Sequence, residues 1–290
     1  MAKSPSHKWG QILGEFLEDS FSKKLKTFAN KQKLYLDTQG IRKARKGKKV
    51  SWTDSFDNAH DLDYVLERNG TENRIGTPVA FIESAWRRYT KHSRNKAQEI
   101  QGAILPLVIT HKNYAPFKGV ILAGEFTQGA ITQLKSLGFE VLYFSYSSIV
   151  KAFAKFKLDA SFDESTSTAE FDKKISDWDK FVDKKKLANY LFKLHKDDVV
   201  QFFETLEKCV SRYINSVVVI ALHGSSNNLS SISKAIDYIE EYKGLNSKST
   251  PLIKYEIIIK YNNGDTIDAS FSSKEDTLGF LKSYSNPKPK

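Results

Sequence analysis

The chain of 290 residues has one cysteine, Cys209, and no long apolar run. A single cysteine excludes an intramolecular disulfide and a multi-cysteine zinc site, and it is typical of a reducing compartment. The best apolar run, residues 216–222, is strand-sized and far shorter than the roughly 18 residues that a membrane helix needs. The basic N-terminus has no apolar segment of the signal-peptide kind. We therefore expect a soluble protein without a membrane partner, long enough to bury a core of its own.

Several catalytic and ligand-binding motifs are also missing. Residues 119–124 begin and end with glycine but match neither the Walker nor the dinucleotide-binding spacing. Ser225 follows a glycine without the pattern of a nucleophile elbow. The histidines at 60, 92 and 111 have no cysteines at metal-ligand spacing. These absences exclude a P-loop, a dinucleotide fingerprint and a cysteine–histidine zinc motif.

Positive charge is abundant and unevenly placed. The chain has 45 Lys and Arg against 34 Asp and Glu, a net charge of +11, and the first 50 residues hold 13 of those cations against four acids. Residues 42–49 carry six cations around one glycine. This composition predicts a mobile loop that contacts the phosphates of a nucleic acid, with an ordinary solvated loop or a patch like a nuclear-import signal as the alternatives. The cations of the loop are Arg42, Lys43, Arg45, Lys46, Lys48 and Lys49.

Hydrophobic periodicity predicts an α/β fold with a mixed central sheet flanked by helices. Apolar residues at three- and four-residue spacing predict a helix over 8–30. The alternation at 61–67 and the apolar stretch 78–83 predict two antiparallel strands. The order of a helix over about 94–105, a strand over 119–124, a helix over 127–137 and a strand over 139–144 predicts a parallel crossover. We assign this core to residues 1–158.

The remaining residues, 159–290, are expected to form an α+β region that supplies dimer contacts or DNA recognition, either separate from the core or packed with it. Helices are predicted over about 168–195, 197–212, 230–242 and 273–284. Strands are predicted over 216–222, 255–261 and 266–271. The last two strands flank the sequence Asn-Asn-Gly-Asp at 262–265, which is typical of a hairpin turn.

Two acids, Asp63 and Glu83, fall on the predicted antiparallel strand pair, with Glu83 expected to end its strand. Two neighbouring acids beside a buried strand are costly unless a cation neutralises them. Oxygen ligands at a sheet edge suit Mg²⁺. Cations follow the second acid closely: Arg87, Arg88, Lys91, Arg94 and Lys96. Acids that hold a metal, surrounded by bases that hold a polyanion, are what phosphodiester hydrolysis needs.

The arrangement resembles the PD-(D/E)XK nucleases, and within them the type II restriction endonucleases. The resemblance covers roughly residues 8–150: a helix with an inward Glu, an Asp, a Glu twenty residues later, a helix, and a strand–helix–strand unit. The block WRRYTKHSRNKAQEI at 86–100 adds to it. The resemblance implies a restriction-endonuclease-like core in which Asp63 and Glu83 hold Mg²⁺.

The chain departs from the family pattern at one catalytic position. The family lysine lies two residues after the second acid, where this chain has Ala85. Either a lysine reaches the site from elsewhere, or the site is inactive. Lys96 on the following helix and Lys91 in the preceding loop are the candidates, and we favour Lys96 because a helix holds an ammonium more firmly than a loop does.

Other positions have alternatives. Glu18 corresponds to the additional Glu that many family members place near the metal, with Glu15 as the alternative. Asp61 shares a strand face with Asp63 and could replace it. Gln98 and Glu99 could add polar contacts.

Structural explanations compete with these catalytic roles. Asp63 could face solvent and Glu18 could lie on an exposed helix flank. Glu83 could pair with Arg87 or Arg88, and Lys96 with Glu99 on the helix surface.

The resemblance implies a Mg²⁺-dependent, sequence-specific endonuclease for double-stranded DNA that leaves 5′-phosphate and 3′-hydroxyl ends. Such enzymes act as homodimers on palindromes, in the prokaryotic cytoplasm, beside a cognate DNA methyltransferase that modifies the same site. Arg87, Arg88 and Arg94 would join the basic loop in contacting DNA. Two alternatives stay open: a repair or junction-resolving nuclease of the same fold, and a non-catalytic DNA-binding protein.

Overall fold

The chain folds into two compact units, Met1–Val210 and Ser211–Lys290. The structure, a computed structural model, describes residues 4–211, 213–222, 226–242, 253–262 and 264–285. The sequence predicted a boundary near residue 158, whereas the contacts divide the chain after Val210. The physical reason is that residues 159–210 cannot bury their apolar faces alone: Phe171, Leu187 and Phe202 belong to the same buried cluster as the N-terminal helix.

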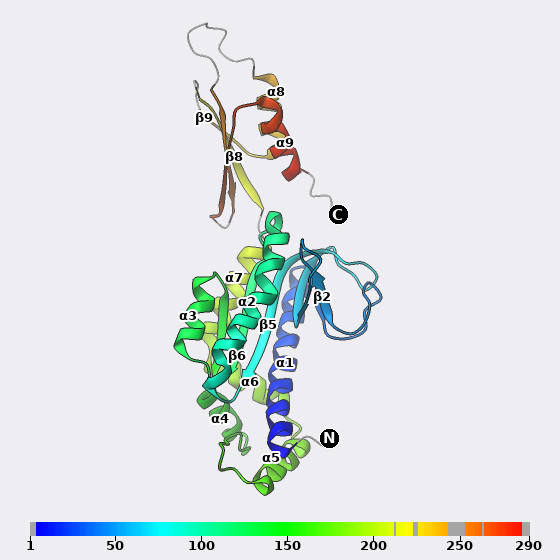
Figure 1. Cartoon of the computed structure of the whole chain (residues 1–290), viewed down its shortest axis with the longest axis vertical. Coiled ribbons are helices and arrows are strands. Elements are labelled where there is room, and N and C mark those ends of the chain that lie inside the picture. Colours follow the sequence, from blue (N-terminus) through cyan, green and yellow to red (C-terminus); the bar gives the residue numbers. More distant parts are fainter. Residues whose placement is uncertain (1–3, 212, 223–225, 243–252, 263, 286–290) are drawn as a thin grey trace. The chain divides into compact units, whose positions relative to one another are not determined.

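A five-stranded mixed sheet forms the centre of the first unit (Figure 1). Its strand order is β1-β4-β5-β6-β7. Strands β1, β4 and β5 pair antiparallel, and β5, β6 and β7 pair parallel. The antiparallel pair and the parallel crossover predicted from the sequence are therefore confirmed, as is the α/β class. The strands are β1 (Tyr35–Thr38), β4 (Tyr64–Arg68), β5 (Thr77–Arg87), β6 (Phe117–Gly124) and β7 (Glu140–Ser145).

Helices and a small hairpin cover this sheet. The helices are α1 (Pro5–Lys31), α2 (Ser93–Thr110), α3 (Gln128–Ser136), α4 (Tyr146–Ala154), α5 (Thr168–Lys180), α6 (Lys184–Leu194) and α7 (Lys196–Val210), with short 3₁₀ turns η1 (Thr90–His92) and η2 (Lys112–Tyr114). The hairpin pairs β2 (Val50–Thr53) with β3 (Ala59–Leu62). The helix predicted over 168–195 is two helices, because the backbone at Phe181 is extended and ends α5.

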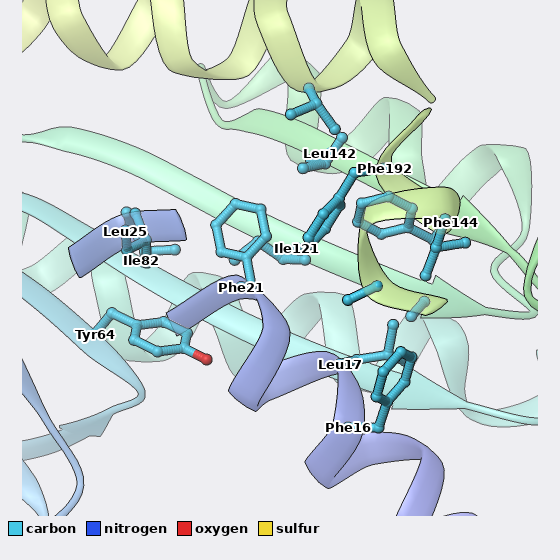
Figure 2. Packing of buried hydrophobic residues seen from close by; sticks show 14 of the residues in the cluster. Phe16, Leu17, Phe21, Leu25, Tyr64, Ile82, Ile121, Leu142, Phe144 and Phe192 are labelled. Atoms are coloured by element: carbon cyan, nitrogen blue, oxygen red, sulfur yellow. The ribbon is translucent and has the colours of Figure 1, made fainter. Parts of the chain in front are cut away.

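The two faces of the sheet bury separate cores. Ile82 of β5 points into a core shared with α1 and α4 to α7, and the adjacent Phe81 points into a core shared with α2, α3 and the hairpin. Helix α1 begins where Ser4 caps it and Pro5 occupies its first turn. Figure 2 shows Phe16 and Phe21 of α1 among the buried side chains of the first core. Burial of these rings fixes α1 against the sheet.

The second unit is a four-stranded antiparallel sheet with two helices. Its strands, in the order β11-β10-β8-β9, are β8 (Ile214–Ala221), β9 (Ser226–Leu229), β10 (Tyr255–Tyr261) and β11 (Thr266–Phe271). The predicted hairpin of the last two strands is confirmed. Helices α8 (Ile232–Glu241) and α9 (Lys274–Ser285) contribute Ile239 and Leu281 to its core. Across the described parts of both units, every helix is too short or too polar to cross a membrane.

Candidate active site

Strands β4 and β5 diverge at the two predicted acids. Their pairing runs from Arg68 opposite Thr77 to Tyr64 opposite Ile82, and beyond Ile82 strand β5 continues with β6 alone. The chain bends at Asp63, between β3 and β4, so the single strand predicted over 61–67 is interrupted there. Glu83 was predicted to end its strand, and this is wrong. Strand β5 extends to Arg87 because its last residues keep their parallel partners in β6.

Hydrogen bonds hold the two carboxylates at this fork. The Asp63 amide donates to Glu83 Oε1 at 3.2 Å. The amide and hydroxyl of Ser84 donate to Asp63 Oδ2 at 2.7 and 2.9 Å. These bonds use one oxygen of each carboxylate, so each acid keeps a second oxygen for a ligand. Sequence reasoning missed the role of Ser84, although its place directly after the second acid was a usable signal.

Lys96 supplies the cation at the site, and Lys91 does not. The Lys96 ammonium on α2 lies 4.0 Å from Glu83 Oε2 and 3.6 Å from Glu99 Oε2, and its side chain is 19% exposed. In contrast, Lys91 is exposed in η1 and borders a different hollow with Glu125 and Glu164. Lys96 therefore pairs with Glu99 on the helix surface and also contacts Glu83.

A third acid, Glu18, reaches the same cleft from α1. The Tyr64 hydroxyl donates to the Glu18 backbone carbonyl at 3.0 Å and ties α1 to β4. Partial burial, followed by the charges of Asp63, Glu15 and Asp19, raises the pKa of Glu18, and a hydrogen bond with the Ser84 side chain opposes this rise. Glu15 lines the cleft as well, one turn away on α1.

The acids are short of compensating positive charge. Burial and the nearby Asp63 carboxylate raise the pKa of Glu83 to about 8, although Lys96 acts in the opposite direction. Burial, Asp63 and Glu18 also raise the pKa of the Tyr64 hydroxyl. Among the described residues, Lys96 is the one cation within ion-pair distance of these three acids, and one ammonium does not offset three carboxylates. The site therefore favours an added proton or an added cation.

The acids open into a cleft of about 900 Å³. Trp86 and Arg87 of β5 line it beside Glu83, and the N-terminal half of α1 lines it beside Glu18. Gly14 of α1 faces Trp86, since a Cβ at this glycine would lie 3.8 Å from the Trp86 Cβ. The cleft is open to solvent and is large enough for a phosphate group with its flanking sugars.

The donor set of the cleft fits Mg²⁺. Within the described residues, no three His, Cys, Asp or Glu side chains are grouped so as to hold a metal ion by themselves. Mg²⁺ does not need such a cage, because it keeps several waters and binds through one or two carboxylates together with substrate phosphate. Asp63 and Glu83 provide those two carboxylates. Asp61 is not an alternative, because it pairs with Lys49 and Ser51 on the hairpin.

Two cations of the predicted phosphate-binding loop are buried. The Arg42 side chain is 2% exposed and donates to Asp37 at 2.8 Å and to Glu67 at 2.6 and 2.9 Å. Arg45 is 8% exposed and also binds Asp37. Burial opposes the charge of Arg42, but the bonds with Glu67 and Asp37 outweigh it and raise the pKa of its guanidinium. The prediction that Arg42 and Arg45 contact DNA from a mobile loop is therefore wrong, because protein acids already bind both.

The other predicted DNA contacts differ in exposure. Arg88 is half-buried: it donates to the Phe162 carbonyl and its guanidinium carbon lies 3.9 Å from the centre of the Tyr146 ring, so it anchors a loop. Arg87 is half-buried in the cleft and donates to the Trp86 carbonyl. Exposed at the surface are Arg94, Lys43, Lys46, Lys48 and Lys49, the last of which pairs with Asp61.

Comparisons with known proteins identify no family for the chain. No family model matches it, and no curated protein does. A solved structure, that of AF1548, a protein of unknown function, is 9% identical and aligns over 60% of this chain and 98% of its own, with a TM-score of 0.28. So low a TM-score carries neither a fold nor an activity to this chain.

Proposed function

We propose that the protein is a Mg²⁺-dependent endonuclease that hydrolyses phosphodiester bonds of double-stranded DNA at a specific short site. The observation that carries this proposal is the acid pair Asp63 and Glu83 in an open cleft: the Asp63 amide binds Glu83, the Ser84 amide binds Asp63, and the Lys96 ammonium lies 4.0 Å from Glu83 Oε2. Two carboxylates and one cation at this spacing form the minimal set for metal-assisted hydrolysis of a phosphate ester.

Each residue has a distinct role. Asp63 and Glu83 would hold Mg²⁺, which when bound supplies Lewis-acid stabilisation of charge on phosphate oxygens. Lys96 donates hydrogen bonds to the attacking water or to the phosphoryl oxygens and stabilises the negative charge that develops on them. Lys96 also compensates for the family lysine missing at Ala85. Glu18 adds negative charge beside the pair, and Ser84 orients Asp63.

Hydrolysis by in-line attack of water on phosphorus would leave 5′-phosphate and 3′-hydroxyl ends. The exposed lysines of residues 43–49 and Arg94 would contact the DNA backbone. The resemblance to type II restriction endonucleases further supports a homodimer on a palindromic site, a cognate methyltransferase for that site, and a prokaryotic cytoplasmic location.

Incubation of the chain with plasmid DNA of known sequence and Mg²⁺, followed by mapping of the ends, tests the proposal. Discrete fragments with 5′-phosphate ends are expected from the wild type and none from Glu83→Gln. Cleavage confined to four-way junctions would assign the site to a junction-resolving enzyme instead. Failure to cleave any duplex with Mg²⁺ or Mn²⁺ would overturn the catalytic proposal.

A further inference from the structure

A second hollow, with a different lining from the acid cleft, runs along α1. This groove has a volume of about 780 Å³ and lies between α1 and the helices α5, α6 and α7. The α1 residues that line it recur at three- and four-residue spacing from Ile12 to Lys31. At 1.5 Å per residue this stripe is about 28 Å long, the length of a helix of about 19 residues.

The floor of the groove is apolar and aromatic. Phe16 and Phe28 of α1 face Trp178, Phe192 and Phe203 of the opposite helices. Most of these rings are buried, and other groups of the protein cover their faces: Trp178 stacks on a phenylalanine of α4 at 5.6 Å, and Phe203 stacks on one of α1 at 5.7 Å. Little ring face is therefore left for stacking of nucleobases. The surface of the groove is more apolar than polar and suits apolar side chains.

Lysines form the rim of the groove: Lys23, Lys24, Lys31, Lys184 and Lys185. Lys23 and Lys31 pair with Asp19 and Glu207. Lys24 and Lys184 instead lie over the floor, each with its ammonium 4.5 Å from the centre of an aromatic ring, that of Phe192 and that of Trp178. Burial lowers the pKa of Lys24. The ammonium groups of Lys24 and Lys184 can turn outward to bind carboxylates while the aliphatic parts of the side chains still cover the floor.

We propose that this groove docks an amphipathic α-helix of a partner protein whose apolar face is flanked by Asp or Glu. The groove matches such a helix in length, in its apolar floor and in its lysine rim. A nucleic acid fits less well, because Glu15, Asp19 and Glu207 also line the groove and a continuous phosphate backbone would have to pass all three. A helix carries few carboxylates and can place them opposite Lys24, Lys184 and Lys185. This inference does not rest on the proposed nuclease function.

A peptide-display selection on the full chain tests the proposal. The library holds 18-residue peptides with apolar residues at positions i, i+3, i+4 and i+7 and randomised charges on their flanks. Enriched peptides are labelled and titrated by fluorescence anisotropy against wild type and the Lys24→Glu/Lys184→Glu variant. The matched control is Lys8→Glu/Lys26→Glu, which makes the same charge change at exposed positions of α1 outside the groove.

The proposal predicts enrichment of Asp and Glu on the flanks. It also predicts about 100-fold weaker binding by the groove variant, about tenfold for each lysine, with the control within about twofold of wild type. Circular dichroism melting verifies the fold, and Lys24→Gln/Lys184→Gln replaces the first variant if that variant unfolds. Enrichment without acidic residues, or equal binding by both variants, would overturn the proposal. A labelled 20-base-pair duplex is tested as a competitor. If the duplex displaces the peptides, and if the groove variant loses duplex binding while the control keeps it, the groove would be assigned to nucleic acid.

Discussion

Two clusters of charged side chains lie at opposite ends of strand β4, and they differ in their burial and in their charge balance. Near Arg68, the acids Asp37 and Glu67 meet two arginines, Arg42 and Arg45. Near Tyr64, Asp63 lies close enough to the acids Glu83 and Glu18 to raise the pKa of each, and the Lys96 ammonium lies beside Glu83. The first cluster is neutral and closed, and the second carries surplus negative charge in an open cleft.

This difference separates a structural role from a binding role. A buried charge that protein groups already neutralise has little left to offer a ligand, and removal of one partner destabilises the fold. A surplus of buried charge costs stability until a ligand of opposite sign arrives.

The largest effect is expected at Glu83. Glu83→Gln keeps the shape of the side chain but removes a metal-binding charge, so Mg²⁺-dependent cleavage should fall by about 10³-fold or more while DNA binding persists. A gel-based cleavage assay and an anisotropy titration measure the two effects. The control is Glu67→Gln in the neutral cluster, which should keep its activity per folded molecule. Retention of cleavage by Glu83→Gln would refute the role of the acid cluster.

Removal of Arg42 should mainly change stability. Arg42→Met leaves Asp37 and Glu67 buried beside a single arginine, and the free energy of unfolding should fall by about 3–5 kcal/mol. Urea denaturation measures this loss. Lys43→Met, the exposed neighbour, should change stability by less than about 0.5 kcal/mol. Equal effects of the two substitutions would show that the buried network does not stabilise the fold.

The two candidate lysines should differ in their effect on catalysis. Lys96→Ala removes the ammonium that lies beside Glu83 and should lower kcat by about 10²–10³-fold. Lys91→Ala should leave kcat near that of the wild type, because its ammonium borders another hollow. Single-turnover cleavage at saturating Mg²⁺ separates this effect from weaker binding. A lower kcat for Lys91→Ala but not for Lys96→Ala would assign the catalytic role to Lys91.

The raised pKa of Glu83 predicts that stability depends on pH in metal-free buffer. The pKa is about 8 in the folded chain against 4.5 for an ordinary Glu, so the folded state binds the extra proton between these values. The free energy of unfolding should therefore fall as pH rises from about 4.5 to 8. Glu83→Gln should be more stable than wild type by roughly 2–4 kcal/mol at pH 8.5, with a smaller gain at pH 6. Urea denaturation measures both free energies of unfolding. An equal difference between Glu83→Gln and wild type at the two pH values would contradict the raised pKa of Glu83.

The smallest effects are expected at the exposed lysines of the basic segment. Lys46→Ala and Lys48→Ala should each weaken DNA binding and lower the slope of log K against log salt by roughly 1. Anisotropy between 50 and 200 mM salt measures the slope. Arg45→Gln should leave the slope unchanged, because Asp37 already binds that side chain. A larger change of slope with Arg45→Gln would restore the arginine as a phosphate contact.

Much of the first unit could be predicted from local pattern. The stripe of α1, the apolar strands β5 and β6, and the short helix α3 each follow from a few adjacent residues. The approach of Asp63 to Glu83 followed from pairing their strands antiparallel. Strand β1 was not predicted, because its four residues form a strand only by pairing with Glu67 and its neighbours, some thirty residues later.

Charge was harder to predict than fold. The segment 42–49 contains six cations that look alike in sequence, yet their exposure depends on acids elsewhere in the chain. Glu67 was the available signal, because an acid in a strand as apolar as Tyr64–Arg68 needs a partner. Position 85 shows the converse case: it carries alanine, and the ammonium beside Glu83 belongs to Lys96 on the next helix, at a distance that the packing of α2 against β5 sets.

Metal binding tests the central contrast most directly. Mn²⁺ binding followed by electron paramagnetic resonance, with Mg²⁺ competition, would compare wild type, Glu83→Gln and Glu67→Gln at pH 7.5. Wild type and Glu67→Gln should bind Mn²⁺ with release of a proton, and Glu83→Gln should lose this binding. Equal binding by all three proteins, or by none, would contradict the claim that the surplus negative charge beside β4 is a cation site.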